Sequence, residues 1–332
     1  MPRPRSSHSR RIPRQLSADD LPQWEQLLIE QHGVVDTEQL AAFGLTPDAI
    51  AAQVEADRWQ PLLPRVYATT TGPPPRVARL QAALRYAGPA AVLSHRTAAE
   101  EWGMVPAQDG PVHVTVPYRC SAVSQPPHVI VHRSRAWEYI AVATVPPRTS
   151  RADTVLDLAT AEPSAREAMH RLIGLVTTCG ISLIDIERQL VERRPYRYQR
   201  ALTAALHRMA GGVASVLEDL YALDVETAHG IPPAHRQAPF EVDGHTLWED
   251  AVYDHVGVPL TVRLDGRAYH SNPLVAFRDR RRDNAAELAG RSRLVFGWRD
   301  IRERPCDAAR EVLTVLHRHR WHGPTLRCHQ CS

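Results

Sequence analysis

Three cysteines near the C-terminus have the residue type and spacing of a metal site. Cys328 and Cys331 form a C-x2-C pair, and Cys306 supplies a third thiol upstream. Thiolates are the ligands of structural zinc, which takes four ligands. The sequence leaves the fourth ligand open among the nearby histidines His317, His319, His322 and His329. The alternative is that all three cysteines are free thiols.

The cysteine count also bears on the cellular compartment. Five cysteines in 332 residues are an odd number at low density, which argues against a disulfide scaffold and for a reducing cytoplasm. Cys120 and Cys179 show no partner pattern and are expected to be buried apolar residues. No run of about 18 apolar residues is present, so we expect no membrane partner.

The chain has no lysine. All 40 residues counted as Lys+Arg are arginine. This excludes Schiff-base chemistry on lysine, pyridoxal-phosphate enzymes, Walker P-loops and lysine general bases. Any chemistry must use Asp, Glu, His, Cys, Arg or a metal.

The arginines are unevenly distributed, although the net charge is only +3. Residues 1–14 carry five arginines and no acid, 188–208 carry six against one acid, and 275–304 carry nine against five. Such patches suit phosphate groups, because arginine donates two parallel hydrogen bonds. The alternative is a set of solvated helix faces.

The elements that position these residues divide the sequence into four parts. Residues 1–20 are a flexible basic tail. Residues 21–75 contain three short helices, of which the second and third start after the N-cap residues Asp36 and Thr46, and a strand or wing, which indicates a winged helix-turn-helix. Residues 76–210 are a mixed α+β domain with a helical connector. In residues 211–332 the patterns follow the order α-β-β-β-α-β-α.

The third short helix is unusual for a DNA-reading helix. Its surroundings carry Asp48, Glu55 and Asp57, and Arg58 is the one basic residue available for nucleic acid. The acidic charge leaves protein docking as an alternative role for this part.

Histidines of the middle domain receive ordinary interpretations from sequence alone. His95 and Arg96 follow Ser94 at a helix start and are expected to cap and pack that helix. His113 and His132 lie on two alternating strands and are expected to be surface histidines rather than ligands.

Residues 23–160 resemble the AbiEi-type antitoxins of bacterial type IV toxin–antitoxin systems. The matching segments are LLIEQHGVVDTEQLAAFGLT, RVYAT, VLSHRTAAEEWGM, HVTVP, VHRS and VPPRTSRADTVLDLA. The resemblance implies a winged-helix DNA-binding domain joined to a second domain, autoregulation of an operon, and a cognate toxin or operon partner.

Residues 211–332 resemble the DUF559 group of endonuclease-like domains, relatives of the very-short-patch-repair endonucleases. The segments that carry the resemblance are SVLE, WEDAVY, VRLDGRAYH, FRDRRRDN, VFGW and the tail RPC…WHGPTLRCHQC. It implies the PD-(D/E)xK restriction-endonuclease fold and a site that cuts phosphodiester bonds.

That resemblance places the catalytic residues on Glu218, Asp250, Asp265 and His270. Carboxylates at the ends of adjacent strands, with a helix glutamate, would hold Mg²⁺ that activates water. His270 would act as base or proton donor.

Two further residues are expected to bind DNA phosphate. Arg278 and Arg282 are four residues apart on one helix face and can clamp a phosphate together.

One position departs from the family pattern. Relatives have a glutamate two residues before the acid that precedes the glycine turn, and this chain has Arg263 there. Arginine cannot ligate Mg²⁺ and repels it.

We therefore expect an α/β (α+β) multidomain protein that binds DNA and has an impaired nuclease site. The first alternative is an active metal-dependent endonuclease or nickase. The second is a protein-interaction antitoxin module.

Overall fold

The computed structural model describes residues 16–17, 19–193, 197–210, 212–213, 215–242, 244–265, 281, 284–328 and 331. The chain divides into two compact units. Unit 1 comprises Met1–Ala161 and Ile184–Arg197, and unit 2 comprises Glu162–Leu183 and Tyr198–Ser332. The architecture is mixed, with helices and three separate sheets. No helix among the described residues is long and apolar enough to cross a membrane.

The first part of unit 1 contains the three predicted short helices and one strand that the sequence did not indicate. Its elements are α1 (Leu21–Glu30), β1 (Val34–Asp36), α2 (Thr37–Ala42), α3 (Pro47–Glu55), β2 (Gln60–Leu63) and β3 (Val66–Ala68). The strands form an antiparallel sheet in the order β1-β3-β2. The predicted helix starts are confirmed, because the side chains of Asp36 and Thr46 cap α2 and α3.

The rest of unit 1 is built on a five-stranded sheet in the order β6-β5-β4-β8-β7. Its elements are α4 (Arg76–Ala87), β4 (Val92–Leu93), α5 (His95–Glu101), β5 (Val112–Pro117), β6 (Val129–Ser134), α6 (Trp137–Ile140), β7 (Ala141–Val142), β8 (Arg148–Thr149), α7 (Arg151–Ala161) and α9 (Leu183–Glu192). Strands β5 and β6, which the alternating patterns predicted, pair in parallel.

Unit 2 contains a four-stranded sheet in the order β12-β11-β10-β9. Its elements are α8 (Ala165–Cys179), α10 (Gln199–Ala210), α11 (Val216–Leu220), a π-helical segment η2 (Tyr221–Thr227), β9 (His235–Val242), β10 (His245–Val252), a short 3-10 turn η3 (Asp254–Val256), β11 (Leu260–Asp265), β12 (Ser292–Gly297), α13 (Trp298–Glu303) and α14 (Pro305–Arg318). Residues 281 and 284–288 are helical as well. The expected order α-β-β-β-α-β-α is therefore present, with α13 added before the final helix.

One expected element differs in kind. The first helix of the expected order begins at Val216 as α11 and continues as the π-helical segment η2. A π-turn widens the helix locally and is often retained at functional positions.

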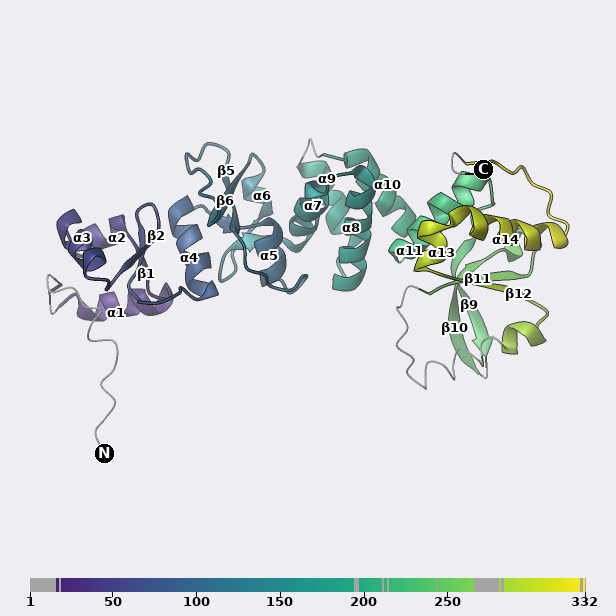
Figure 1. The fold of residues 1–332 in the computed structure, drawn as a ribbon, viewed down its shortest axis with the longest axis horizontal. Helices are drawn as coiled ribbons and strands as arrows, with labels where there is room; N and C mark the ends of the chain where they lie inside the picture. The colour runs from purple at the N-terminus through teal and green to yellow at the C-terminus, as the bar shows by residue number, and fades with distance from the viewer. Residues whose placement is uncertain are drawn as a thin grey trace, which may run out of the picture. The chain divides into compact units, whose positions relative to one another are not determined.

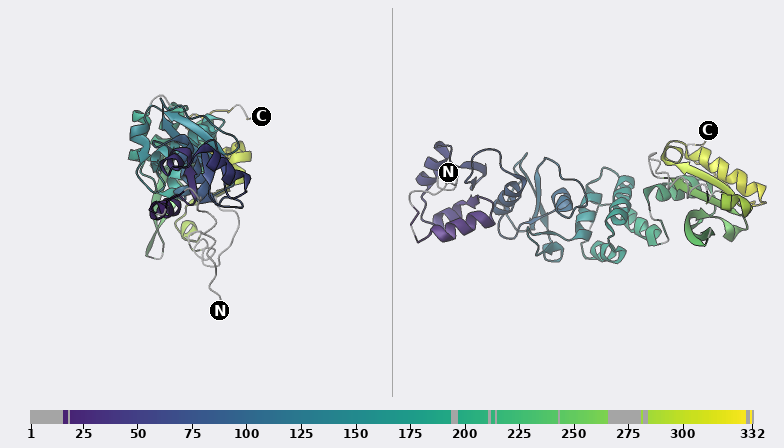
Figure 2. Two further views of the ribbon diagram at one scale, coloured as in Figure 1. Left: turned by 90° about the vertical axis from the view of Figure 1, so that its left-hand side faces the viewer. Right: turned by 90° about the horizontal axis from the view of Figure 1, so that it is seen from below.

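The core of unit 2 lies between one face of the sheet and the helices. Ala251, Val262 and Phe296 from three neighbouring strands belong to one buried cluster with Val312 and Leu316 of α14. Figures 1 and 2 show α14 running along the sheet. Alternation along the strands then directs the intervening side chains to the opposite face.

A buried polar network holds η2 to the sheet. The carboxylate of Glu226 accepts hydrogen bonds from the Tyr253 hydroxyl at 2.8 Å and from the Ala234 amide at 3.0 Å, and it pairs with the Arg236 guanidinium. The Tyr253 and Tyr221 hydroxyls share a further bond of 2.8 Å. The network joins the helix that precedes the sheet to strand β9 and to Tyr253, the residue that follows β10.

Replacing Glu226 by alanine is expected to lower the free energy of unfolding of unit 2 by about 3–5 kcal/mol, because Arg236 keeps a buried charge without its partner. Urea unfolding followed by hydrogen exchange of β9 and β10 peptides measures this. Glu303→Ala removes an exposed pair with Arg299 and should cost about 0–1 kcal/mol. Equal effects of the two variants would contradict the role of the network.

Candidate functional site

The three C-terminal cysteines come together, as their spacing predicted. Cys306 lies in the first turn of α14, and Cys328 and Cys331 lie on the tail that follows this helix. The sulfur atoms are 3.4 Å (Cys306–Cys328), 3.6 Å (Cys328–Cys331) and 3.7 Å (Cys331–Cys306) apart. These separations are far longer than the roughly 2.05 Å of a disulfide, and none of the five cysteines is in a disulfide.

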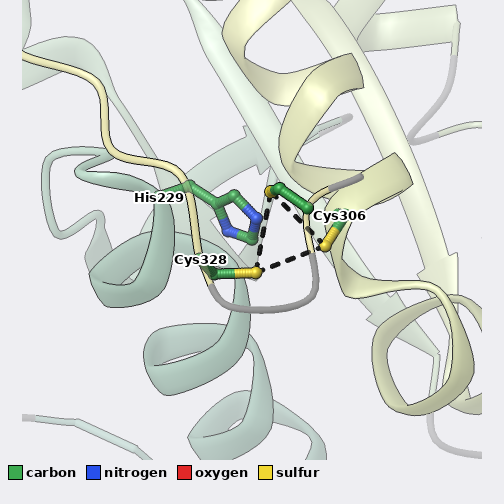
Figure 3. A group of neighbouring side chains, drawn as sticks. His229, Cys306 and Cys328 are labelled. Carbon is green, nitrogen blue, oxygen red and sulfur yellow. Dashed lines mark hydrogen bonds between the residues drawn. The ribbon is translucent and has the colours of Figure 1, made fainter.

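A histidine that the sequence did not single out completes the group. A ring nitrogen of His229 and the three sulfur atoms all lie within 4.8 Å of one another. Figure 3 shows the His229 imidazole turned toward the sulfur atoms of Cys306 and Cys328. We call these four residues the cysteine cluster. It is a candidate metal-binding cluster.

The hydrogen bonding of His229 prepares its ring as a ligand. His229 is 3% exposed, and its Nδ1 lies 3.0 Å from the carbonyl oxygen of Val225, to which it donates. The lone pair is then on Nε2, which is buried and has no hydrogen-bond partner among the described residues. A buried ring nitrogen facing three thiols fits a metal, because metal-binding histidines commonly donate their other nitrogen to a carbonyl or carboxylate.

The four histidines considered from sequence do not complete the cluster among the residues that the structure describes. His319 Nε2 lies 3.4 Å from Ser292 Oγ. His317 stacks on Trp321 and His322. His329 lies outside the described residues.

The tail reaches the cluster because it lies directly against residues 229 and 230. The Leu326 amide donates to the His229 carbonyl at 2.9 Å. Gly230 has a φ of +68°, and a Cβ there would lie 2.9 Å from the Pro324 carbonyl oxygen. Glycine is thus required at this position both for its backbone conformation and for the close approach of the tail.

Burial and the neighbouring thiols raise the pKa of Cys306 to about 12. Its thiol is therefore protonated at neutral pH while the cluster is free of metal. A bound cation would displace this proton and favour the thiolate.

The predicted acids of the sheet occupy two strands. Asp250 Oδ2 accepts a hydrogen bond of 2.7 Å from the Leu264 amide, so this carboxylate lies against β11. The β10–β11 ladder pairs Ala251 with Val262. Continued by one pair, this register places Asp250 opposite Arg263, and residues directly opposite in an antiparallel pair share a face.

Asp265 and Glu218 are placed differently from each other. Asp265 is exposed at the end of β11. Glu218 is 5% exposed in the first turn of α11, and both its amide and its Oε1 bond with Ser215 Oγ, at 3.2 and 3.1 Å. Within the described part of the chain, Glu218, Asp250 and Asp265 do not form a compact ligand group like the cysteine cluster.

The remaining predicted site residues are a histidine and three arginines. Arg58 follows α3, and its Nε donates to Gln53 Oε1 at 2.7 Å. His270, Arg278 and Arg282 lie outside the described residues.

The structure revises several side-chain expectations in unit 1. Ser94 makes no side-chain cap to α5; its Oγ instead lies 3.0 Å from His95 Nδ1. His113 and His132 are partly buried and contact each other, with 3.0 Å between Nδ1 and Nε2. Cys120, and likewise Cys179 of unit 2, were expected to be buried and are partly exposed.

In comparisons with known proteins, no family model and no curated protein matches this chain.

Replacing Gly230 by alanine is expected to detach the tail from His229, because the added Cβ meets the Pro324 carbonyl. If the substitution lowers the free energy of local opening of the tail by about 1.4 kcal/mol or more, the rate of hydrogen exchange at the Leu326 amide should rise about tenfold or more. Gly257→Ala is the matched control, since Gly257 also has a positive φ of +76° but has nothing within 4 Å of its Cβ position. Unchanged protection of Leu326 in Gly230→Ala would contradict this packing.

Proposed function

We propose that this chain is a DNA-binding protein whose unit 2 keeps the framework of a nuclease but does not cut. The observation that carries the proposal is the antiparallel β10–β11 register, which pairs Ala251 with Val262 and, when continued by one pair, brings Arg263 opposite Asp250. A guanidinium on the same face as this carboxylate would compete with a divalent cation for its negative charge. It also supplies a bidentate donor for a phosphate.

The arrangement of strands supports the nuclease framework. Strands β9, β10 and β11 form an antiparallel series, and β12 joins β11 in parallel. A helix precedes the series, and helical residues lie between β11 and β12. This is the arrangement that the resemblance to PD-(D/E)xK endonucleases implies. Likeness of fold alone does not carry an activity, which is why Arg263 decides between binding and cutting.

The distribution of charge favours unit 2 as the main DNA contact. Helix α3 of unit 1, the expected reading helix of a winged helix-turn-helix, carries Asp48 and Glu55 and no arginine. Phosphate groups would be repelled there. In unit 2, Arg299 and Arg304 of the arginine-rich segment expose 86% and 69% of their side chains.

The acidic face of α3 favours a second role for unit 1. An exposed acidic helix suits a basic protein surface better than a phosphate backbone. The corresponding candidate function is docking of a protein partner, such as the cognate toxin that an antitoxin would neutralise.

The test of the main proposal combines DNA binding and plasmid nicking on the same protein. We expect binding that weakens steeply with salt, and a salt slope that falls by roughly two in the double variant Arg278→Ala/Arg282→Ala, one for each lost phosphate contact. Arg58→Ala should leave the slope almost unchanged. Supercoiled plasmid should remain intact in Mg²⁺ or Mn²⁺.

Two outcomes would overturn it. The first is nicking by the unmodified chain that disappears in Asp250→Asn, which keeps an acceptor for the Leu264 amide and is therefore a better control than alanine. The second is a shallow salt dependence that the double variant does not change. Nicking that appears only in Arg263→Glu would support the proposal, since it restores the carboxylate of the family pattern.

We further propose that the cysteine cluster binds Zn²⁺. With Zn–S bonds of about 2.3 Å, a tetrahedral site has sulfur–sulfur edges of about 3.8 Å. The observed 3.4–3.7 Å are close to this value. Three thiolates and one imidazole form a closed ligand set, typical of zinc that stabilises a fold rather than of zinc that activates water.

The zinc proposal predicts that the cysteine cluster holds one equivalent of zinc tightly. Cys306→Ser and His229→Ala should each weaken zinc binding about a hundredfold or more. This exceeds the effect of removing a residue that only hydrogen-bonds to a metal ligand. Competition with a chromophoric chelator measures this affinity. Cys179→Ser, in the same unit but outside the cluster, is the control. Equal affinity in His229→Ala and the unmodified chain would contradict the assigned fourth ligand.

A further inference from the structure

Three histidines of unit 1 meet at one point although they come from three different elements. His95 begins α5, His113 is in β5 and His132 is in β6. One ring nitrogen from each lies within 4.8 Å of the others. We call these residues the histidine cluster. The parallel pairing of β5 and β6 sets Thr115 opposite His132, so His113 reaches His132 diagonally across the two strands.

Two of the ring nitrogens are nearly as close together as two ligands of one metal ion. His113 Nδ1 and His132 Nε2 are 3.0 Å apart. With metal–nitrogen bonds of about 2.0–2.1 Å, tetrahedral geometry requires edges of about 3.3 Å. The rings of His95 and His132 are stacked, with centroids 3.6 Å apart. A bound metal would replace the hydrogen bond between the two nitrogens. The stacked rings of His95 and His132 would then rotate so that a nitrogen of each points at the metal.

A buried carboxylate facing the cluster is the second, independent observation. Asp157 of α7 is 3% exposed, and its Oδ2 has no hydrogen-bond partner among the described residues. This oxygen lies 3.6 Å from His95 Nδ1. The other oxygen, Oδ1, accepts a hydrogen bond of 2.9 Å from Arg193, which keeps the carboxylate in place.

Two of the three rings are half-buried among polar neighbours. Burial lowers the pKa of His113 to about 4 and that of His132 to about 3. The Oδ2 atom of Asp157 is a buried acceptor without a hydrogen-bond donor among the described residues, which is costly to keep; a proton held on His95 Nδ1 by a metal on the other nitrogen would satisfy it.

We propose that His95, His113 and His132 form a second metal site, for Zn²⁺ or a similar divalent transition metal, with Asp157 as the positioning carboxylate of His95. Nδ1 of His95 faces Ser94 and Asp157, so Nε2 is its ligand atom. Three histidines leave a fourth coordination position for water or a small anion, unlike the closed cysteine cluster. The carboxylate–histidine–metal chain fixes the ring orientation.

The experiment is a titration of the full chain with Zn²⁺, and in parallel with Co²⁺, after the first equivalent has filled the cysteine cluster. We expect a second equivalent to bind, with a Co²⁺ visible spectrum that lacks the thiolate charge-transfer band. His132→Gln and His95→Gln should each weaken this second step about a hundredfold or more. His128→Gln, an exposed histidine of the same unit, should not change it.

Two variants distinguish metal binding at the histidine cluster from binding at the cysteine cluster and from the positioning role of Asp157. Cys306→Ser should retain the histidine-site step while it weakens the first. Asp157→Asn should weaken the second step about 10–100-fold while the Co²⁺ spectrum keeps its shape, because the three ligands remain. Circular dichroism of each variant shows that unit 1 is folded. Absence of a second step in the unmodified chain, or its persistence in folded His132→Gln and His95→Gln, would overturn the proposal.

Discussion

The contact of the C-terminal tail with His229 and Gly230 is the interaction on which the cysteine cluster of unit 2 depends. It brings together the end of the helix before the sheet, the start of α14 and the last residues of the chain, three segments far apart in sequence. Apolar packing contributes little at Leu326, which is 59% exposed, although Trp321 at the start of the tail packs against the core of unit 2. A metal bridging three thiolates and an imidazole would add binding energy here, as structural metal sites do in small domains.

In the function that we propose for unit 2, one charge decides between binding and cutting. Arg263 would change the electrostatics of the sheet face that carries Asp250. The chain has no lysine, so no lysine can contribute to that face. Under this proposal the face would hold a phosphate rather than cleave one.

Much of the local structure could be predicted from the sequence. Asp36 and Thr46 indicated helix starts because their short side chains cap the first turn. The alternation of apolar and polar residues in 111–117 and 128–133 indicated β5 and β6. The C-x2-C pair indicated a cluster because its two ligands are neighbours in sequence. Strand β1 could not be predicted, since it is only three residues long and nearly all buried, which erases any alternation.

Residues brought together by tertiary packing were not predictable. His229 lies far in sequence from Cys306, and its ring is oriented by a hydrogen bond to the backbone carbonyl of Val225. His95, His113 and His132 looked unrelated because each has an ordinary role in its own element. Only the pairing of β5 with β6 and the placement of α5 and α7 bring the rings and Asp157 together.

The most direct test of the account is the zinc K-edge absorption fine structure of the full chain loaded with one equivalent of zinc. The account predicts a first shell of three sulfur atoms at about 2.3 Å and one nitrogen at about 2.0 Å. A shell of nitrogen and oxygen ligands alone would contradict the central claim that a metal fixes the tail of unit 2.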